Sequence, residues 1–284
     1  MNKDFCIFIL THGRPDKVIT LNALKKSNYS GDFFLIVDNE DKTVDKYIEN
    51  FGEDKVLLFD KLEISKTFDT FDNSDDRRAI VYARNVTFDF AKKLGYKYFM
   101  QLDDDYTDFR YKFNSKYEYG DKINPPNLDK LLYYLLEFYK SISAKSIAIA
   151  QGGDFIGGKN GSFAKKITVK RKTMNTFICS VDRPFKFIGR INEDVNTYTT
   201  LQSRGNLFLT INQIGINQLM TQTNSGGMAD MYLDSGTYIK SFFTVITAPN
   251  SCKIRLMGTV NKRLHHMIKW ENAVPKIINE KHKK

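Results

Sequence analysis

The chain has 284 residues, 42% hydrophobic and 27% charged, a balance that predicts a packed globular core and excludes intrinsic disorder. It contains no run of about 18 apolar residues and no signal-peptide pattern, so we expect neither a membrane span nor a membrane partner. The formal net charge of +10 is uneven, because residues 1–150 carry 23 basic and 25 acidic residues whereas residues 151–284 carry 20 and 8.

The first 105 residues alternate strand and helix patterns with short connections. Apolar runs predict buried strands, and periodic or capped stretches predict helices. This alternation predicts an α/β fold with a mostly parallel central sheet and helices on both faces. In chain order we expect strand 4–10, helix 16–27, strand 33–37, helix 44–51, strand 55–59, helix 79–94 closed by Gly95, and strand 96–102.

The pattern changes near residues 110–150. We see no internal repeat and no linker long enough to separate domains, so we expect one two-lobed domain over residues 1–284. Beyond residue 110 we expect helix 128–139, strands 146–150, 176–181, 207–212 and 242–247, and a helix at 195–202.

Three adjacent carboxylates, Asp103, Asp104 and Asp105, directly follow the strand 96–102. They repel one another unless a cation neutralises them, and hard oxygen ligands suit Mg²⁺ or Mn²⁺, which in turn bind a diphosphate. In extended backbone Asp103 and Asp105 would share a face and Asp104 would point away. A solvated acidic turn is the alternative, but the position at the end of a buried strand favours a metal site.

Further polar residues follow other predicted strands. Thr11 and Arg14 come after the first strand and Asp38 ends the second, and ligands of such sheets bind beyond the carboxyl ends of the strands. One crevice would therefore collect these residues and the acidic triplet. Arg84, in the helix 79–94, would reach a phosphate with two N–H groups, or lie on the surface as an ordinary arginine.

An acidic pair, Glu193–Asp194, precedes the predicted helix 195–202. The positive end of a helix dipole favours an ionised carboxylate, which can accept a proton in a transition state. Capping of the helix would explain the pair without catalysis, but we favour the catalytic role.

The basic half contains a concentrated run of charge. Five cations fall within eight residues, which suits contact with a polynucleotide backbone or a solvated lysine face; they are Lys165, Lys166, Lys170, Arg171 and Lys172. The excess of positive charge around the run favours nucleic acid.

The remaining single residues give weaker signals. Cys6, Cys179 and Cys252 are widely spaced, offer no zinc spacing and suit a reducing, cytoplasmic setting, so we expect them to be buried. Trp270, the one tryptophan, fits packing of the tail better than stacking on a base or a sugar.

These motifs together resemble those of GT-A glycosyltransferases. The resemblance lies in Thr11-His12-Gly13-Arg14, Asp38, Ala83-Arg84-Asn85, Leu102-Asp103-Asp104-Asp105 and Glu193-Asp194. Within that class the chain looks most like the TET/JBP-associated glycosyltransferases of bacteriophages and their relatives. That group includes the base J glucosyltransferases and is associated with hydroxylated pyrimidines in DNA. The segments 222–228 and 265–270 look like this subgroup.

The resemblance implies a metal-dependent, inverting transfer of a sugar from a nucleotide-sugar, with a UDP-sugar favoured, to a hydroxylated pyrimidine base in phage DNA. Residues of about 1–110 would form the donor half and about 111–284 the basic acceptor half, and the setting would be the host cell cytoplasm. The donor contacts that it implies are Thr11, Arg14, Asp38 and Asp103. Arg84 and Asp104 are further expected donor-binding residues because of their positions in the crevice.

The resemblance also implies the metal and the base. Asp105 would be the main ligand of Mn²⁺ or Mg²⁺, with Asp103 facing the ribose or the metal. Asp194 would be the general base, with Glu193 beside it. His265 or His266 would complete a site that then favours Mn²⁺; two half-exposed helix histidines are the alternative. Residues 165–172 would contact the DNA acceptor.

Two other functions fit part of the sequence. A sugar-nucleotide nucleotidyltransferase also uses Asp with Mg²⁺, but it usually carries a Gly-rich, Arg/Lys-bearing loop after the first strand, and residues 11–15 are short with one Gly. A non-catalytic nucleic-acid-binding module would use the basic half alone, and it would gain nothing from three carboxylates in its crevice.

Overall fold

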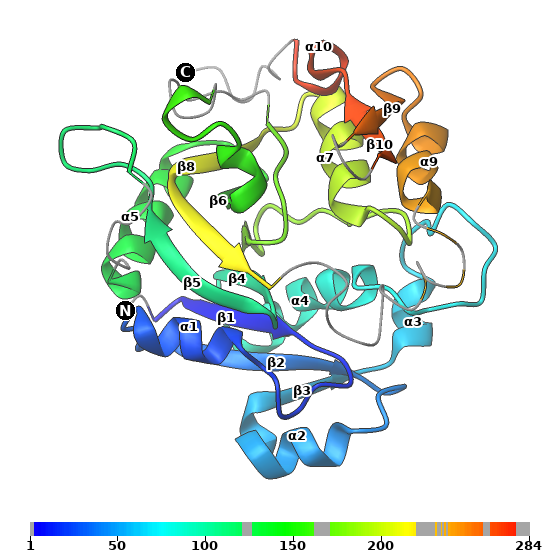
Figure 1. Cartoon of the computed structure of the whole chain (residues 1–284). Coiled ribbons are helices and arrows are strands. Elements are labelled where there is room, and N and C mark those ends of the chain that lie inside the picture. Colours follow the sequence, from blue (N-terminus) through cyan, green and yellow to red (C-terminus); the bar gives the residue numbers. More distant parts are fainter. Residues whose placement is uncertain are drawn as a thin grey trace.

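The computed structural model describes residues 3–120, 127–161, 171–219, 231, 234, 236, 238–257 and 262–276, and Figure 1 shows its helices and strands. The strands are β1 (Phe5–Leu10), β2 (Asp32–Asp38), β3 (Val56–Phe59), β4 (Tyr98–Asp103), β5 (Tyr106–Tyr111), β6 (Ser146–Gln151), β7 (Phe177–Ser180), β8 (Phe208–Gln218), β9 (Cys252–Met257) and β10 (Arg263–Ile268). The helices are α1 (Thr20–Lys26), α2 (Val44–Phe51), α3 (Lys61–Ser65), α4 (Val81–Leu94), α5 (Leu128–Ser141), α7 (Glu193–Ser203), α9 (Tyr238–Thr247) and α10 (Trp270–Ala273). Short 3-10 turns occur at η1 (Glu53–Lys55), η2 (Gly152–Phe155) and η3 (Gly158–Asn160).

An eight-stranded sheet crosses the molecule in the order β3-β2-β1-β4-β7-β6-β8-β5. The first four strands are mutually parallel, as are β6 and β8. β7 is antiparallel to both of its neighbours, and β5 is antiparallel to β8. The prediction of a mostly parallel α/β sheet is therefore confirmed. Since β1, β2 and β4 run the same way, their carboxyl ends open at one edge.

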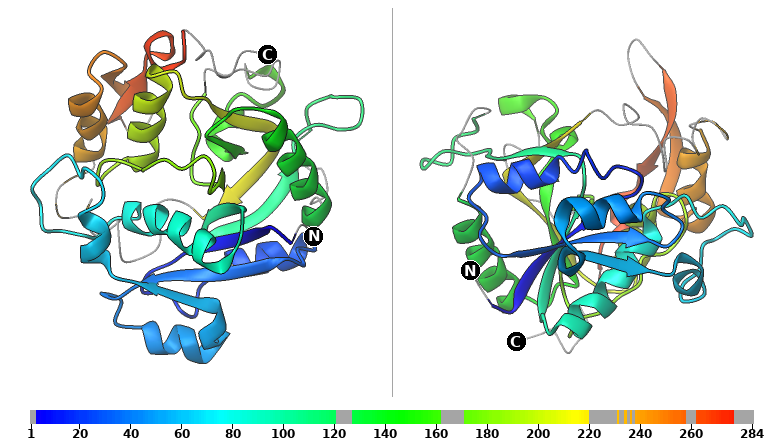
Figure 2. Two further views of the ribbon diagram at one scale, coloured as in Figure 1. Left: turned by 180° about the vertical axis from the view of Figure 1, so that it is seen from behind. Right: turned by 90° about the horizontal axis from the view of Figure 1, so that it is seen from below.

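Helices cover both faces of this sheet (Figures 1 and 2). Ile7 and Ile9 of β1 pack in a cluster with residues of α1, α2 and α5. Cys6 and Phe8 alternate to the other face and pack with residues of α4 and α7. A strand buried on both faces reads as a continuous apolar run, which is why the sequence predicts β1, β2 and β4 well.

Two helix ends test the sequence predictions, and one of them agrees while the other is shifted. Gly95 adopts a left-handed conformation at φ +83° and its N–H bonds to the carbonyls of Ala91 and Lys92, so its predicted C-cap role is confirmed. The helix predicted at 16–27 begins only at Thr20. Its hydroxyl donates to the carbonyl of Asp103 at 2.6 Å, so the preceding residues instead form a loop against the turn after β4.

The sequence misplaces part of the C-terminal region. The strand predicted at 242–247 is wrong, because these residues lie in α9. Short apolar runs rich in β-branched residues do not distinguish a strand from a helix by periodicity. His265 and His266 do not lie on a helix either; they lie on β10, which pairs antiparallel with β9. β5 and β9 are not predicted from the sequence.

The C-terminal elements pack on α7 (Figure 1). Trp270 stacks on Tyr198 of α7 with 5.8 Å between ring centroids and 16° between planes, so the packing role favoured for this tryptophan is confirmed. The three cysteines are buried and unpaired, as expected. Among the helices of the described residues, none combines the length and apolar composition that a membrane span needs.

Candidate active site at the carboxyl ends of β1, β2 and β4

The acidic triplet lies where β4 turns into β5. β4 ends at Asp103, and Asp104 and Asp105 form the turn that leads into β5 at Tyr106. The extended backbone assumed from the sequence therefore stops at Asp103. As a result the three carboxylates lie in three different environments. This differs from the prediction, in which Asp103 and Asp105 share one face.

Asp104 ties the turn to the loop after β1. Its carboxylate accepts a hydrogen bond from the Thr11 hydroxyl at 2.7 Å and pairs with the Arg14 guanidinium at 3.0 Å. Tyr47 joins this group through its hydroxyl, which lies 2.8 Å from Thr11 Oγ1 and accepts from the Arg14 backbone N–H at 2.8 Å. Burial raises the pKa of Asp104, although Arg14 and Thr11 oppose the shift. The predicted meeting of these loops is thus present.

Asp103 is held by a buried arginine. Arg84 donates from Nη2 to Asp103 at 3.0 Å and from Nε to Glu193 at 2.8 Å. Its guanidinium also lies over the rings of Phe177 and Phe187. Burial raises the pKa of Asp103 to about 6, with Arg84 lowering it and the neighbouring carboxylates raising it. One arginine therefore joins the acidic turn to the N-terminus of α7.

These contacts bear on the predicted phosphate role of Arg84. The side chain is fully buried and already engaged by two carboxylates and by the Asn175 amide oxygen at 3.2 Å. Its geometry is that of a residue that positions other groups. Direct contact with a donor phosphate stays a prediction.

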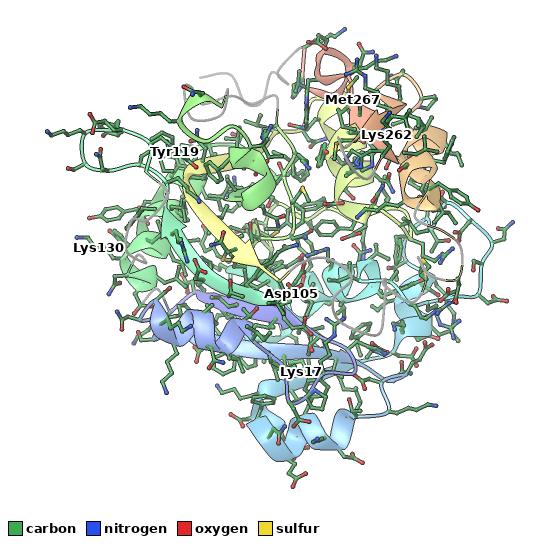
Figure 3. All side chains as sticks on the ribbon, viewed as in Figure 1. Lys17, Asp105, Tyr119, Lys130, Lys262 and Met267 are labelled. Atoms are coloured by element: carbon green, nitrogen blue, oxygen red, sulfur yellow. The ribbon has the colours of Figure 1, made fainter. Side chains whose placement is uncertain are left out.

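Asp105 differs from both neighbours. Its half-buried carboxylate has no hydrogen-bond or ion-pair partner from another residue in the described part of the chain. Burial, followed by the charges of Asp103 and Asp104, raises its pKa to about 7. Figure 3 labels it near the centre of the view. A bound cation would supply the positive charge that this carboxylate lacks among the described residues.

The N-terminus of α7 provides the second acidic pair. Asp194 is buried and accepts from the Val195 backbone N–H at 2.7 Å; no described side chain donates to it. Burial and the charge of Asp194 raise the pKa of Glu193, which Arg84 opposes. Both carboxylates lie in the first turn, where the helix dipole favours negative charge. Glu193 is thus committed to Arg84, whereas Asp194 keeps acceptor capacity.

Asp38 anchors a further cluster at the end of β2. It is buried, and it receives His12 Nδ1 at 2.7 Å and Lys61 Nζ at 3.0 Å. Burial raises the pKa of Asp38, but the bond from His12 and the charge of Lys61 outweigh this and hold it below its usual range. The bond to Asp38 likewise raises the pKa of His12 despite its partial burial. Asp41 closes the loop by accepting from the Gly13 backbone N–H at 2.6 Å.

The sequence did not single out four members of these clusters. Lys61 lies two residues after the end of β3, so the rule that selected Asp38 would also have found it. His12 lay within the motif Thr11-His12-Gly13-Arg14 but was given no role. Asp41 and Tyr47 sit in a loop and a helix without a distinctive pattern, and only the fold brings them to the site.

Comparison with known proteins assigns the chain to a family. A family model described as TET-Associated Glycosyltransferase matches residues 5–227. The chain belongs to the TET-associated glycosyltransferase family. It is therefore a glycosyltransferase, and the matched region contains the acidic turn, Arg84 and the Glu193–Asp194 pair. A search of curated protein sequences finds no significant match.

Solved structures of other transferases are similar to this TET-associated glycosyltransferase only at a distance. Glucosyl-3-phosphoglycerate synthase from Mycobacterium tuberculosis, with Mg²⁺ and UDP, is 10% identical, covers 93% of this chain and 87% of its own, and gives a TM-score of 0.46. S. aureus TarS with UDP-GlcNAc is 13% identical, with coverage of 79% and 60% and a TM-score of 0.45. A putative nucleotide-diphospho-sugar transferase from Desulfovibrio desulfuricans is 8% identical, with coverage of 88% and 96% and a TM-score of 0.43. Similarity at this level assigns no ligand to the TET-associated chain.

The two histidines predicted as metal ligands of the glycosyltransferase lie on β10, and His266 is close to the start of α7. His266 is buried, and its Nδ1 is 3.4 Å from Asn192 Nδ2. Burial, followed by the charges of His265, Lys172 and Lys240, lowers the pKa of His266 to about 3. No group of three or more His, Cys, Asp or Glu side chains within the described ranges could hold a metal ion. A metal role for either histidine stays a prediction.

The basic run predicted to contact DNA falls mostly outside the described residues. Lys165, Lys166 and Lys170 lie there, as does the segment 222–228. Arg171 pairs with the buried Asp154 at 2.6 Å, so part of its charge is neutralised within the protein. Lys172 is half-buried. Contact of this run with DNA stays a prediction.

A cleft of about 680 Å³ lies away from the acidic turn, between the C-terminal end of α7 and α10. Its lining includes Arg204 and Lys276 but none of the predicted site residues. Among the described residues that line it, none is an aspartate or a glutamate.

Proposed function

We propose that this glycosyltransferase is metal-dependent and inverting, and that it moves a sugar from a UDP-sugar to a hydroxylated pyrimidine base in DNA. The observation that carries the metal and the donor is the carboxylate of Asp105, which has no partner in the described part of the chain, beside two carboxylates that are each paired with an arginine. We further propose a single two-lobed domain, with about residues 1–110 as the donor half and about 111–284 as the acceptor half.

The donor set of the residues suits a hard divalent cation. Mg²⁺ is commonly bound by one or two carboxylates, with substrate phosphates and water completing its shell. Asp105 supplies one such oxygen ligand, and Asp103 lies next to it while remaining attached to Arg84. A bound cation would neutralise the charge that develops on the leaving diphosphate.

The protein's own residues would orient the donor. Asp38, held by His12 and Lys61, and Asp104, held by Arg14, form a rigid rim at the ends of β2 and β4. Paired and buried carboxylates keep one geometry, which is what a nucleoside site requires. Thr11 and Arg14 complete the rim from the loop after β1.

Asp194 would accept the proton of the acceptor. The acceptor oxygen forms a bond to C1 of the sugar, the bond between C1 and the diphosphate oxygen breaks, and the hydroxyl proton passes to the Asp194 carboxylate. Attack from the face opposite the leaving group inverts C1. Glu193 fixes the turn by its bond to Arg84 and leaves Asp194 as the base.

Two findings support DNA as the acceptor. The family is described as TET-associated. The chain also concentrates its positive charge in residues 151–284, with 20 basic and 8 acidic residues, which favours a polyanion.

Ligand-induced stabilisation tests the donor and the metal. Thermal unfolding would be followed with a panel of nucleotide sugars and Mn²⁺, each with and without EDTA. A ligand at about 100 times its dissociation constant adds roughly 2.7 kcal/mol. We expect a UDP-sugar to stabilise the wild type only with metal, and Asp105→Asn to lose this response. Asp108→Asn is the matched control, because Asp108 already pairs with Arg110 and Asn217.

A transfer assay tests the acceptor. DNA containing hydroxymethylated pyrimidines would be incubated with the enzyme, Mn²⁺ and the stabilising donor, then digested and analysed by mass spectrometry. We expect one hexose per modified base, and none on DNA that lacks the hydroxyl. A metal-dependent donor response with no transfer to any hydroxylated DNA would reject the acceptor while keeping the donor class.

A further inference from the structure

The C-terminal elements lie beyond the region that the family model matches, which ends at residue 227. The described part of this extension consists of α9, the two strands β9 and β10, and α10. Figure 2 shows in its right panel that the β9–β10 ribbon projects from the body of the molecule beside α9. Its role is therefore not explained by the shared fold.

The two faces of the ribbon differ in character. Cross-strand neighbours on one face include Ile254 with His266, which is buried and lies 3.4 Å from Asn192. β10 also contacts α9, where Ser241 donates to the backbone carbonyl of Leu264 at 2.8 Å. The opposite face carries Lys253 and Arg255, which are both exposed. The alternation follows from the two-residue period of a strand.

The charge on the ribbon is all of one sign. Residues 249–270 contain five basic residues and no acidic residue. The exposed cations Lys253, Arg255, Lys262 and Lys269 form no ion pair or hydrogen bond through their side chains within the described part of the chain. Figure 3 labels Lys262 on the ribbon, at the upper right. Like charges gathered on one ribbon repel one another, and a bound polyanion would remove that cost.

The ribbon is attached to the helix that carries the proposed base. Trp270, just after β10, stacks on Tyr198 of α7. At the N-terminal end of α7, Asn192 bonds to the Lys240 carbonyl of α9 and lies 3.4 Å from His266 of β10. Asn192 directly precedes Glu193 and Asp194. Because the ribbon packs on α7, a ligand bound to the ribbon would be fixed in position relative to Glu193 and Asp194.

We infer that the outward face of the β9–β10 ribbon binds the phosphate backbone of duplex DNA and so holds the acceptor at the N-terminus of α7. This inference rests on the proposed function, since it takes the acceptor to be DNA. Contacts of lysine and arginine with phosphates fix register without reading sequence, as an enzyme that recognises one modified base requires. A two-stranded ribbon also has the width that the major groove of DNA admits.

Equilibrium binding to a fluorescent duplex at several salt concentrations tests the inference. The variants are Lys253→Gln/Arg255→Gln and Lys253→Glu/Arg255→Glu, both at exposed positions. The plot of log K against log salt has a negative slope, and each lost phosphate contact reduces its magnitude by about 1. We therefore expect the magnitude to fall by about 2 in the Gln variant. The Glu variant should bind more weakly still. Unchanged thermal unfolding and an unchanged UDP-sugar response would show that both variants are folded.

The matched control is Lys116→Glu/Lys130→Glu, which changes the net charge by the same amount as the Glu variant at exposed positions remote from the ribbon. Figure 3 labels Lys130 on the opposite side of the view from Lys262. We expect this control to keep most of the DNA affinity and of the salt slope. An equal loss in the control would mean that only overall charge matters, and it would overturn the inference.

Other outcomes separate the inference from the proposed function. Wild-type affinity and slope in both ribbon variants would place the DNA contact elsewhere and leave the proposed reaction intact. Failure of the wild type to bind DNA at low salt, with the metal-dependent donor response present, would remove DNA as the acceptor and the inference with it. Binding to anionic phospholipid vesicles that the ribbon variants lose, without any DNA binding, would assign the ribbon to a membrane surface instead.

Discussion

The turn after β4 and the β9–β10 ribbon both concentrate charge, but they hold it under different conditions. In the turn, Asp103 and Asp104 are largely withdrawn from water and each pairs with an arginine. On the ribbon, Lys253 and Arg255 are exposed and pair with no described residue. Buried charges must be paired because desolvation is expensive, whereas exposed charges cost little and remain available to a partner.

The contrast separates residues that fix the site from residues that meet a ligand. Arg84 joins two carboxylates on different elements, so it fixes the end of β4 relative to the start of α7. Asp105 belongs to the turn by sequence, yet among the described residues it is unpaired like the ribbon cations. We therefore expect the two unpaired groups to bind ligands of opposite charge, a cation at Asp105 and a polyanion at the ribbon.

Replacing the proposed base should have the largest effect. We expect Asp194→Asn to lower kcat by about 10²–10⁴-fold with little change in donor affinity, because the amide cannot accept the acceptor proton. The measurement is single-turnover transfer to hydroxylated DNA, with donor affinity followed by thermal unfolding. Glu193→Gln is the comparison, since it should reduce stability as well as rate. Full activity in Asp194→Asn would place the base on another residue.

Removing the buried arginine should have the largest effect on stability. Arg84→Met leaves Asp103 and Glu193 buried without their shared cation, which we expect to cost about 3 kcal/mol of unfolding free energy near pH 8. The loss should shrink toward pH 5, because the pKa of Asp103 is raised to about 6 and its carboxyl is largely neutral there. Urea unfolding at the two pH values measures it.

The control for that substitution is an exposed arginine with two carboxylate partners. Arg78 pairs with Asp76 and Asp234 at the surface. We expect Arg78→Met to change stability by less than about 1 kcal/mol, because exposed ion pairs contribute little. Equal losses for Arg78 and Arg84 would contradict the distinction between buried and exposed charges.

The sequence predicts the parts of this fold that depend on local patterns. β1, β2 and β4 are continuous apolar runs. Because the carboxyl ends of parallel strands meet at one edge of a sheet, Thr11, Asp38 and the acidic triplet are expected together there. The hydrogen bonds from Thr11 and Arg14 to Asp104 confirm that placement.

Other features depend on contacts between distant segments. The sequence gives no reason for Asp103 and Glu193, which are 90 positions apart, to share Arg84. The sequence predicts a strand at 242–247, within α9, because the apolar residues there are β-branched and aromatic. Its exposed Tyr238, Phe242 and Ile246, which recur at four-residue spacing, agree with a helix only once burial is known.

Loosening the ribbon from α7 should have a moderate effect. Trp270→Ala removes the stack on Tyr198 and some apolar burial, and we expect a loss of about 2 kcal/mol. Hydrogen exchange should show faster opening of β9 and β10, and DNA affinity should fall while the UDP-sugar response is retained. Tyr238→Ala, at a side chain that is 59% exposed, is the control and should change stability little. Unaltered exchange in β10 would show that the stack does not hold the ribbon.

The smallest predicted effect tests the unpaired carboxylate without metal. The pKa of Asp105 is raised from 3.8 to about 7, so between about pH 4 and pH 7 the folded protein holds a proton that the unfolded chain has released. Stability from this group therefore falls as pH rises through that window. With EDTA present, Asp105→Asn should be more stable than wild type at pH 8, by on the order of 1 kcal/mol after allowing for solvent screening, and equal near pH 4.

Asp108 provides the opposite sign three residues away. Burial raises the pKa of Asp108, but Arg110 and Asn217 outweigh it and hold the pKa below its usual value. Its stabilising contribution is present above about pH 4 and is lost as pH falls. We therefore expect Asp108→Asn to lower the melting temperature at pH 8, while Asp105→Asn raises it. A decrease in both variants would mean that Asp105 has a partner in solution even without metal, and the cation site would then lie elsewhere.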